Sequence, residues 1–433
     1  TADKYCAGNW SGNFLNWATM ARIDAVRKIL FGGLRPAPGR PGQNGGQQDQ
    51  RRCQAAADAN RQYPAQALQT TMAGEHEAAE AHHRSERRNQ HGRGGRRAQR
   101  IAARLPPEIV DCVNTLEMML HQRKAISFSP KGPEGLLDII EMGAIVAGGN
   151  DELRLNPYLM KLGEPISPLV HDGHAIKELM ICAEYELPIV YYPIPMGGAT
   201  APATSAGLLA QGHAESLAGL VIHQLVKPGA PFLYGGVATV MDMRSTACVY
   251  GGPELYLQCA ALADMANYFE LPFWGTAGCT DTVDLDEQGA AEIGMSCLLA
   301  ALSGANLVHD VGLLDQASLV DPVTILFCDE VIDHVKHFMQ GIHFSPENFA
   351  MDVINDVGAG GNYLSENHTL DHFRNFWTPT YFRRPSLDGM VDKGLLEVLN
   401  EKVLEIEKSH EVPPLEEDKV KALRELEKKW LKG

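Results

Sequence analysis

From about residue 101 onwards, short apolar runs alternate with longer amphipathic stretches. The apolar runs contain β-branched or aromatic residues, as expected of strands buried on both faces. They lie at residues 125–130, 162–170, 188–196, 231–241, 271–278 and 305–314. Between them, apolar positions recur at a spacing of three and four residues, which is typical of helices. Six consecutive strand–helix units predict a parallel sheet with right-handed crossovers.

A closed α/β barrel needs eight such units, and only six are recognisable. Before residue 125 the sequence offers one helix-like stretch, at 106–122. We therefore expect a TIM-type (β/α)8 barrel that is truncated at its N-terminal side, followed by charged amphipathic C-terminal helices with a solvated face. An open parallel edge exposes unpaired backbone groups, so the chain should be unstable or form a homo-oligomer.

The first hundred residues have a different composition. Residues 34–100 are rich in Gln, Arg, Ala, Gly and His without hydrophobic periodicity, which predicts disorder. An arginine-rich tract could bind nucleic acid, but this one lacks the interleaved aromatic residues of single-strand binders, so a solvated tail is the preferred interpretation. Residues 1–100 carry 16 Lys and Arg against 8 Asp and Glu, a net charge of +8. Because the whole chain has a net charge of −16, residues 101–433 must carry −24. Such an acidic body disfavours nucleic acid and favours cationic ligands.

The remaining composition excludes several classes of protein. The nine cysteines form no C-x-x-C pair, which argues for reduced thiols rather than disulfides or a zinc knuckle. No His, Asp or Glu cluster has ligand spacing, so we expect no metal site of its own. No run approaches the roughly 18 apolar residues of a membrane span, and the first residues do not resemble a signal peptide. We expect a cytoplasmic protein without a membrane partner.

Polar residues stand at the C-terminal ends of four apolar runs, where a parallel barrel builds its active site. They are His171 and Asp172, Asp242 and Arg244, Thr280 and Asp281, and His309 and Asp310. In the run 196–204, Gly197 and Gly198 permit close backbone approach, while Thr200 and Pro202 suit a helix cap and first turn. The exposed N–H groups there could hold an anion such as a carboxylate, and a tight turn without a ligand is the alternative.

Seven segments in order resemble the trimethylamine methyltransferase family. They are EMGAIVAGG (141–149), EPISPLVHD (164–172), MGGATAPAT (196–204), TVMDMR (239–244), GTAGCTD (275–281), SGANLVHDVG (303–312) and VGAGGNYLSENHT (357–369). The resemblance implies a TIM barrel that moves a methyl group from a methylated amine to the cobalt of a separate corrinoid protein. Residues 1–33 resemble, instead, a segment of PilY-type pilus biogenesis proteins. A fusion or gene-assembly error explains this junction, and a divergent N-terminal domain is the alternative.

A methylated ammonium donor suggests which side chains would bind it. Aromatic rings attract such cations, which makes Tyr192, Tyr234 and Trp274 candidates, although each could equally be a core residue. Asp281 or Asp310 could balance the ammonium charge.

The resemblance places Cys279 where trimethylamine enzymes of this family carry pyrrolysine, so it implies a quaternary amine such as glycine betaine as donor. A catalytic thiolate at Cys279 is a sharper alternative, but no Lys or Arg is adjacent to lower its pKa. His309 and Asp310 could form a general-base pair. Because neighbouring strand residues point to opposite faces, a direct contact between them is not expected.

Two other functions remain open. One is a metal- or Schiff-base-dependent lyase, which is disfavoured because Lys161 is expected to precede its strand and no other strand ends in Lys. The other is an inactive barrel fragment.

Overall fold

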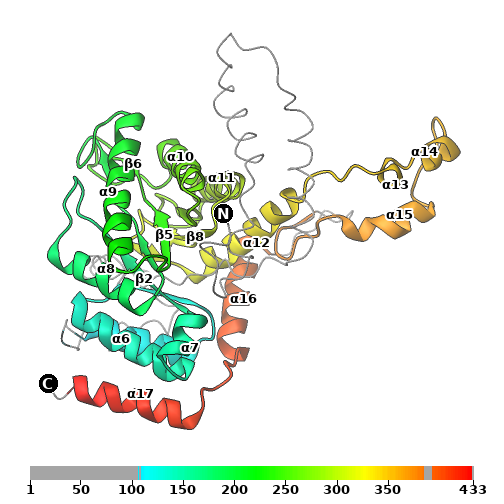
Figure 1. Ribbon diagram of the computed structural model, residues 1–433. Helices are drawn as coiled ribbons and strands as arrows, with labels where there is room; N and C mark the ends of the chain where they lie inside the picture. The colour runs from blue at the N-terminus through cyan, green and yellow to red at the C-terminus, as the bar shows by residue number, and fades with distance from the viewer. Residues whose placement is uncertain (1–105, 107–108, 385–392, 432–433) are drawn as a thin grey trace.

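The computed structural model describes residue 106, residues 109–384 and residues 393–431 (Figure 1). The PilY-like segment 1–33 and the low-complexity tract 34–100 lie outside the described residues.

A single parallel sheet organises the fold, with six strands in the order β1-β2-β3-β5-β7-β8. The strands are β1 (Ile126–Phe128), β2 (Leu159–Gly163), β3 (Ile189–Tyr191), β5 (Phe232–Gly235), β7 (Phe273–Thr276) and β8 (Leu307–His309). Each overlaps one of the six apolar runs, which confirms the predicted parallel α/β sheet. In the described part of the chain no strand pairs with the outer edges of β1 or β8, so the curled sheet is open there.

The position of β2 corrects one expectation. Lys161 lies within β2 and does not precede it. Its ammonium group is buried and contacts the Glu178 carboxylate at 2.5 Å. This partner neutralises a charge that a buried strand would otherwise exclude.

A helix follows each strand and packs against the sheet. These helices are α6 (Gly132–Ala147), α8 (Gly173–Tyr185), α9 (Ser205–Val226), α10 (Pro253–Tyr268), α11 (Glu287–Ser303) and α12 (Pro322–Phe338). Two short pairs decorate the loops: parallel β4 (Met196–Gly197) with β6 (Thr239–Val240), and antiparallel β9 (Leu313–Leu314) with β10 (Leu319–Val320). None of the described helices is both long and apolar enough to cross a membrane.

Side chains of the sheet alternate between two faces. On the outer face, Tyr191 of β3 packs so tightly on α9 that a Cβ at Gly219 would lie 2.2 Å from its ring. Tyr234 is paired with Tyr191 across the sheet and shares this face. Their neighbours in sequence therefore point the other way. We call that second side, which carries Tyr192 and Trp274, the inner face.

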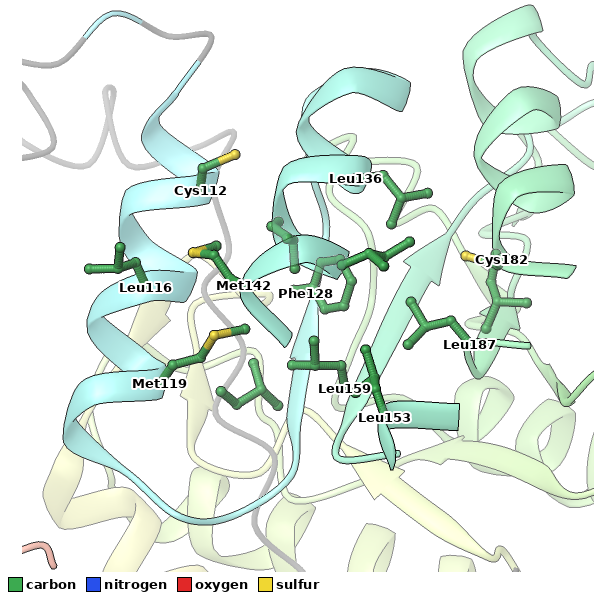
Figure 2. Close-up of a cluster of buried hydrophobic side chains, with 14 of the residues drawn as sticks. Cys112, Leu116, Met119, Phe128, Leu136, Met142, Leu153, Leu159, Cys182 and Leu187 are labelled. Carbon is green, nitrogen blue, oxygen red and sulfur yellow. The ribbon is translucent and has the colours of Figure 1, made fainter. Parts of the chain in front are cut away.

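The largest hydrophobic cluster lies at the β1 edge (Figure 2). Leu116 and Met119 of α5 (Val110–His121) meet Phe128 of β1 and Leu136 of α6 there. The C-terminal helix α17 (Glu417–Trp430) buries Leu423 and Leu426 in the same cluster. Likewise, α16 (Leu395–Ser409) buries Leu399 against α12. Each of the two C-terminal helices thus contributes to the core, and their other sides are solvated.

Between α12 and α16 the chain makes a long excursion. Residues 341–376, which we call the arm, contain only short helices: α13 (Pro346–Phe349), α14 (Met351–Val357), α15 (Asn367–His372) and the 3-10 turn η2 (Phe373–Asn375). The arm extends away from the body (Figure 1). The remaining short helix, α7 (Asn150–Leu155), connects α6 to β2.

Candidate functional site

Four buried side chains gather on the inner face, from the C-terminal ends of β3 and β8 and from within β7. They are Tyr192, Trp274, His309 and Asp310, here called the inner cluster. The His309 ring stacks on Trp274 at a centroid distance of 4.9 Å and lies 5.9 Å from the Tyr192 ring. The fold therefore brings the three predicted ring side chains together with one acidic group, the Asp310 carboxylate.

His309 and Asp310 do make direct contact, which corrects the expectation that they could not. His309 Nδ1 lies 2.8 Å from Asp310 Oδ1. β8 ends at His309, and Asp310 adopts a left-handed φ of 69°, which turns its side chain back towards the preceding residue. The strict alternation of a strand does not extend to this residue.

The hydrogen bonding of the inner cluster is incomplete. His309 Nε2 pairs with Thr276 Oγ1 at 2.9 Å. Asp310 Oδ2 and Trp274 Nε1, both buried, have no hydrogen-bond partner among the described residues. Buried polar atoms are nearly always paired, because an unpaired one lowers the stability of the fold. Two such atoms in one cluster therefore indicate a site that serves a purpose other than stability.

Acidic groups dominate the electrostatics around the inner cluster. Burial raises the pKa of Tyr192 well above its ordinary value, and the nearby Glu164 carboxylate, which accepts a hydrogen bond from the Tyr192 hydroxyl, raises it further. Burial and then the Asp310 carboxylate raise the pKa of Tyr250 in the same way. Lys161, the one lysine in the described strands, points to the outer face and its Glu178 partner. The inner cluster therefore suits a cation.

Cys279 is fully buried beside this cluster. Burial raises the pKa of its thiol well above 9, and the Asp310 carboxylate adds to the effect. Both causes disfavour a thiolate, so the arrangement gives the nucleophilic alternative no support.

Asp281 is occupied by the backbone. Its carboxylate accepts hydrogen bonds from Tyr250 N at 2.7 Å and Gly251 N at 2.9 Å, which fixes the loop before α10. Burial raises the pKa of Asp281, and these two bonds oppose that shift. Glu292 of α11 in turn accepts a bond from Asp281 N at 3.0 Å. Asp281 thus positions the loop that carries Tyr250.

The glycine-rich run forms a turn rather than a helix start. Thr200 Oγ1 accepts a hydrogen bond from Met196 N at 2.9 Å, and Gly198 has a φ of +91°. A Cβ at Gly197 would lie 3.3 Å from Val240 Cγ1 of β6. α9 begins only at Ser205, with Thr204 as its N-cap, so Thr200 and Pro202 are not its cap and first turn. The turn residues themselves form the contact between β4 and β6.

The other sequence candidates lie elsewhere. The Tyr234 hydroxyl pairs with His213 Nδ1 at 2.8 Å on the outer face. Asp242 accepts hydrogen bonds from Arg244 N at 3.1 Å and Ser245 Oγ at 2.7 Å in an exposed turn. His171 pairs with the Tyr191 hydroxyl on the outer face, and Asp172 caps α8.

Sequence reasoning missed Glu164, Tyr250 and Thr276. Glu164 opens the segment EPISPLVHD, and Thr276 stands two residues after Trp274, which places it on the same face of β7. That period of two was the available signal for Thr276. In the described part of the chain no three His, Cys, Asp or Glu side chains are grouped so that they could hold a metal ion.

Two family models match different parts of the chain. Residues 107–430 match the family described as "Trimethylamine methyltransferase (MTTB)". Residues 1–80 match "PilY1 homolog, small alpha/beta domain", which runs beyond residue 33 into the tract expected to be of low complexity.

Similar proteins are named as methyltransferases of methylated amines. A glycine betaine methyltransferase of Desulfitobacterium hafniense strain Y51 is 33% identical over 314 residues, or 71% of this chain and 64% of that protein. The trimethylamine methyltransferase MttB of D. hafniense strain DSM 10664 / DCB-2 is 34% identical, over 62% of this chain and 54% of that protein. MttB2 of Methanosarcina mazei is 33% identical, over 66% of this chain and 58% of that protein. The chain thus spans between about half and two thirds of the length of these relatives. The family match at residues 107–430 includes the whole inner cluster, and the chain belongs to the trimethylamine methyltransferase family.

Proposed function

We propose that the inner cluster binds a methylated ammonium compound and presents one of its methyl groups to a corrinoid carried by a partner protein. The observation that supports this most is the unpaired, buried Oδ2 of Asp310 beside the rings of Tyr192 and Trp274. A buried carboxylate oxygen without a hydrogen-bond partner is costly, and an organic cation offsets that cost.

The six strand–helix units are best explained as part of a (β/α)8 barrel. Six parallel strands in sequential order with a helix after each match the barrel's repeating unit. Tyr192, His309 and Asp310 of the inner cluster stand at the C-terminal ends of their strands, where enzymes with that architecture bind substrates.

The chemistry requires little proton transfer. When a methyl group leaves a quaternary nitrogen, the C–N electron pair stays on nitrogen and a neutral amine departs. The partner's corrinoid supplies a cobalt(I) nucleophile for the methyl group. The residues of this chain have to orient the cation and exclude water, and electron-rich ring faces do both.

We infer a quaternary donor rather than trimethylamine. Cys279 is an ordinary, fully buried cysteine whose thiol stays protonated, and it offers no electrophile for a free amine. One relative at 33% identity is named as a glycine betaine methyltransferase.

Binding and turnover should be measured on the same protein. We expect the full chain to bind tetramethylammonium, choline or glycine betaine by calorimetry and to demethylate one of them when a reduced corrinoid protein is added. Asp310→Asn should weaken binding at least tenfold, about 1.4 kcal/mol, because the neutral amide no longer attracts the cation. The matched control is Asp242→Asn, whose carboxylate lies in an exposed turn.

The competing functions predict different results. Release of dimethylamine from trimethylamine, with none from quaternary amines, would refute the donor class. A folded protein that binds none of the amines would favour the inactive fragment. The lyase hypothesis has less support, because Lys161 forms an ion pair with Glu178 on the outer face and so lies away from the inner cluster.

A further inference from the structure

One oxygen of the Asp310 carboxylate is left for a ligand. Asp310 Oδ1 lies 2.8 Å from His309 Nδ1, whereas Oδ2 is buried and has no hydrogen-bond partner among the described residues. The Asp310 side chain is only 4% exposed, so bulk water reaches little of it. A carboxylate oxygen only accepts hydrogen bonds. What Asp310 Oδ2 lacks is therefore a donor.

Neighbouring donors of the chain do not supply this hydrogen bond. The Tyr192 hydroxyl donates to Glu164. The indole Nε1 of Trp274 is a donor, but it too is buried without a partner in the described part of the chain. After burial, the carboxylates of Glu164 and Asp310 both raise the pKa of Tyr192, so negative charge surrounds this place. The missing donor should therefore belong to a ligand, and that ligand should be a cation.

A quaternary ammonium ion supplies the charge but not the hydrogen bond. Its nitrogen carries four carbon atoms and no N–H group. Its polarised methyl C–H groups can contact Asp310 Oδ2, but such contacts are weaker than an N–H bond. A protonated tertiary ammonium ion has one N–H group, which can form a charge-assisted hydrogen bond of about 2.7–2.9 Å. The two ions differ by one methyl group, and this is the group that the proposed reaction removes.

Two opposing effects decide which of these ions binds more tightly. The additional methyl group favours the quaternary ion, because burying one more apolar carbon raises affinity about fourfold. The hydrogen bond favours the tertiary ion, because a bond between charged groups raises affinity on the order of 10- to 100-fold. The hydrogen bond is the larger effect, and the tertiary ion should bind roughly 3- to 30-fold more tightly.

We propose that the inner cluster binds the protonated tertiary ammonium product more tightly than the quaternary donor, through an N–H bond to Asp310 Oδ2, and that the enzyme is therefore inhibited by its own product. This inference rests on the proposed function, which supplies the donor. Transfer of the methyl group leaves the C–N electron pair on nitrogen. That lone pair takes a proton from solvent water, since aliphatic amines are protonated at neutral pH, and the new N–H group points to Asp310 Oδ2.

Calorimetry of the full chain at pH 7 tests the preference with pairs of ligands that differ by one N-methyl group. The pairs are tetramethylammonium with trimethylammonium, choline with N,N-dimethylethanolamine, and glycine betaine with N,N-dimethylglycine. In each pair that binds, the tertiary member should have a Kd at least about threefold lower. In turnover, the tertiary member should inhibit competitively against its quaternary partner.

Two variants assign the preference to one atom. Asp310→Asn keeps the shape but makes the acceptor neutral, which about halves the strength of the bond, so the ratio of the two Kd values should fall to about one. The matched control is Trp274→Phe, which keeps a ring but removes the other unpaired atom, a donor that cannot accept the N–H bond. Its ratio should stay within about twofold of the wild type, and circular dichroism should show wild-type helix content in both variants.

The outcomes separate this inference from the proposed function. If none of the ammonium ions binds, both fail. If a quaternary ion binds and is demethylated but its tertiary partner binds no more tightly, only the product preference is overturned. The product preference is also overturned if Asp310→Asn keeps the wild-type ratio or if Trp274→Phe loses it. The comparison in the wild type needs no variant, so it decides the matter even where a variant fails to fold.

Discussion

The ion pair between Lys161 and Glu178 offers a sharp test of how the sheet is joined to its helices. Lys161 lies in β2 and Glu178 in α8, with side chains only 4% and 7% exposed and their charged atoms 2.5 Å apart. Replacing Lys161 by Met keeps most of the buried volume but removes the charge. Glu178 then stays buried without its positive partner, and either its charge or its protonation costs free energy.

The expected cost is large. Breaking a buried pair by removing one partner typically destabilises a protein by about 3–5 kcal/mol, which is a substantial part of the roughly 5–15 kcal/mol that holds a domain folded. Replacing both partners, as in Lys161→Met with Glu178→Leu, removes the uncompensated charge as well. That double variant should recover most of the loss, because apolar replacements of buried pairs are often neutral or stabilising.

Urea unfolding followed by circular dichroism measures these differences. With a slope of about 3 kcal/mol per molar urea, Lys161→Met should lower the midpoint by about 1 M or more, and the double variant should lie close to the wild type. The exposed pair Lys402 and Glu405 provides the control, since Lys402→Met should leave the midpoint unchanged. A midpoint for Lys161→Met equal to that of the wild type, or a double variant worse than the single one, would refute the reasoning.

Three further outcomes follow from the structure. Cys279 should react with iodoacetamide at pH 8 far more slowly in the folded protein than in urea, because burial and the Asp310 carboxylate hold its pKa well above 9; peptide mass spectrometry measures this, and equal rates would contradict it. Burial lowers the pKa of His223 from 6.5 to about 4, so between these values the unfolded chain binds more protons than the folded one. The stability of the wild type relative to His223→Leu should therefore be constant above pH 6.5 and decrease as the pH falls towards 4, and a pH-independent difference in urea midpoint would speak against it. Glu330 of α12 accepts a hydrogen bond from Thr380 N. Glu330→Ala should lower the local stability there by about 1.5–3 kcal/mol and speed amide hydrogen exchange at Thr380, with exchange in β3 unchanged. Equal exchange at Thr380 in the variant and the wild type would show that Glu330 does not anchor this segment.

The strands could be predicted because their sequence pattern is local. Buried parallel strands need apolar, β-branched or aromatic residues, and the loops between them contain Gly and Pro. The boundary of β2 was less predictable, because the apolar run continues past Gly163 into the loop that contains Ile166. The Ser167 hydroxyl and the Leu169 amide in that loop are held by Glu215 of α9, a contact that spans 46 residues or more. No local pattern can reveal such a partner.

Which way a side chain points was harder to predict than where it lies. Tyr192 and Tyr234 both follow apolar residues near a strand end, and both were reasonable candidates for binding a cation. The register pairs Tyr234 with Tyr191, so Tyr234 and Tyr192 fall on opposite faces of the sheet. Register depends on the pairing of residues that are 43 positions apart in the chain, which composition does not encode.

The aspartates near strand ends and helix starts differ in the hydrogen bonds that their carboxylates make. Asp172, Asp286 and Asp321 each accept backbone hydrogen bonds at the start of a helix, and Asp281 binds two amides of a loop. Asp310 differs from all four. It has a left-handed φ, makes its close contact with a neighbouring histidine, and leaves one buried oxygen unpaired. A non-glycine residue in that conformation, with an unpaired buried oxygen, persists only when the surrounding fold enforces it, and such features gather at functional sites. The same residue type therefore stabilises the fold at four positions, and at the fifth its geometry is the basis of the proposed cation site.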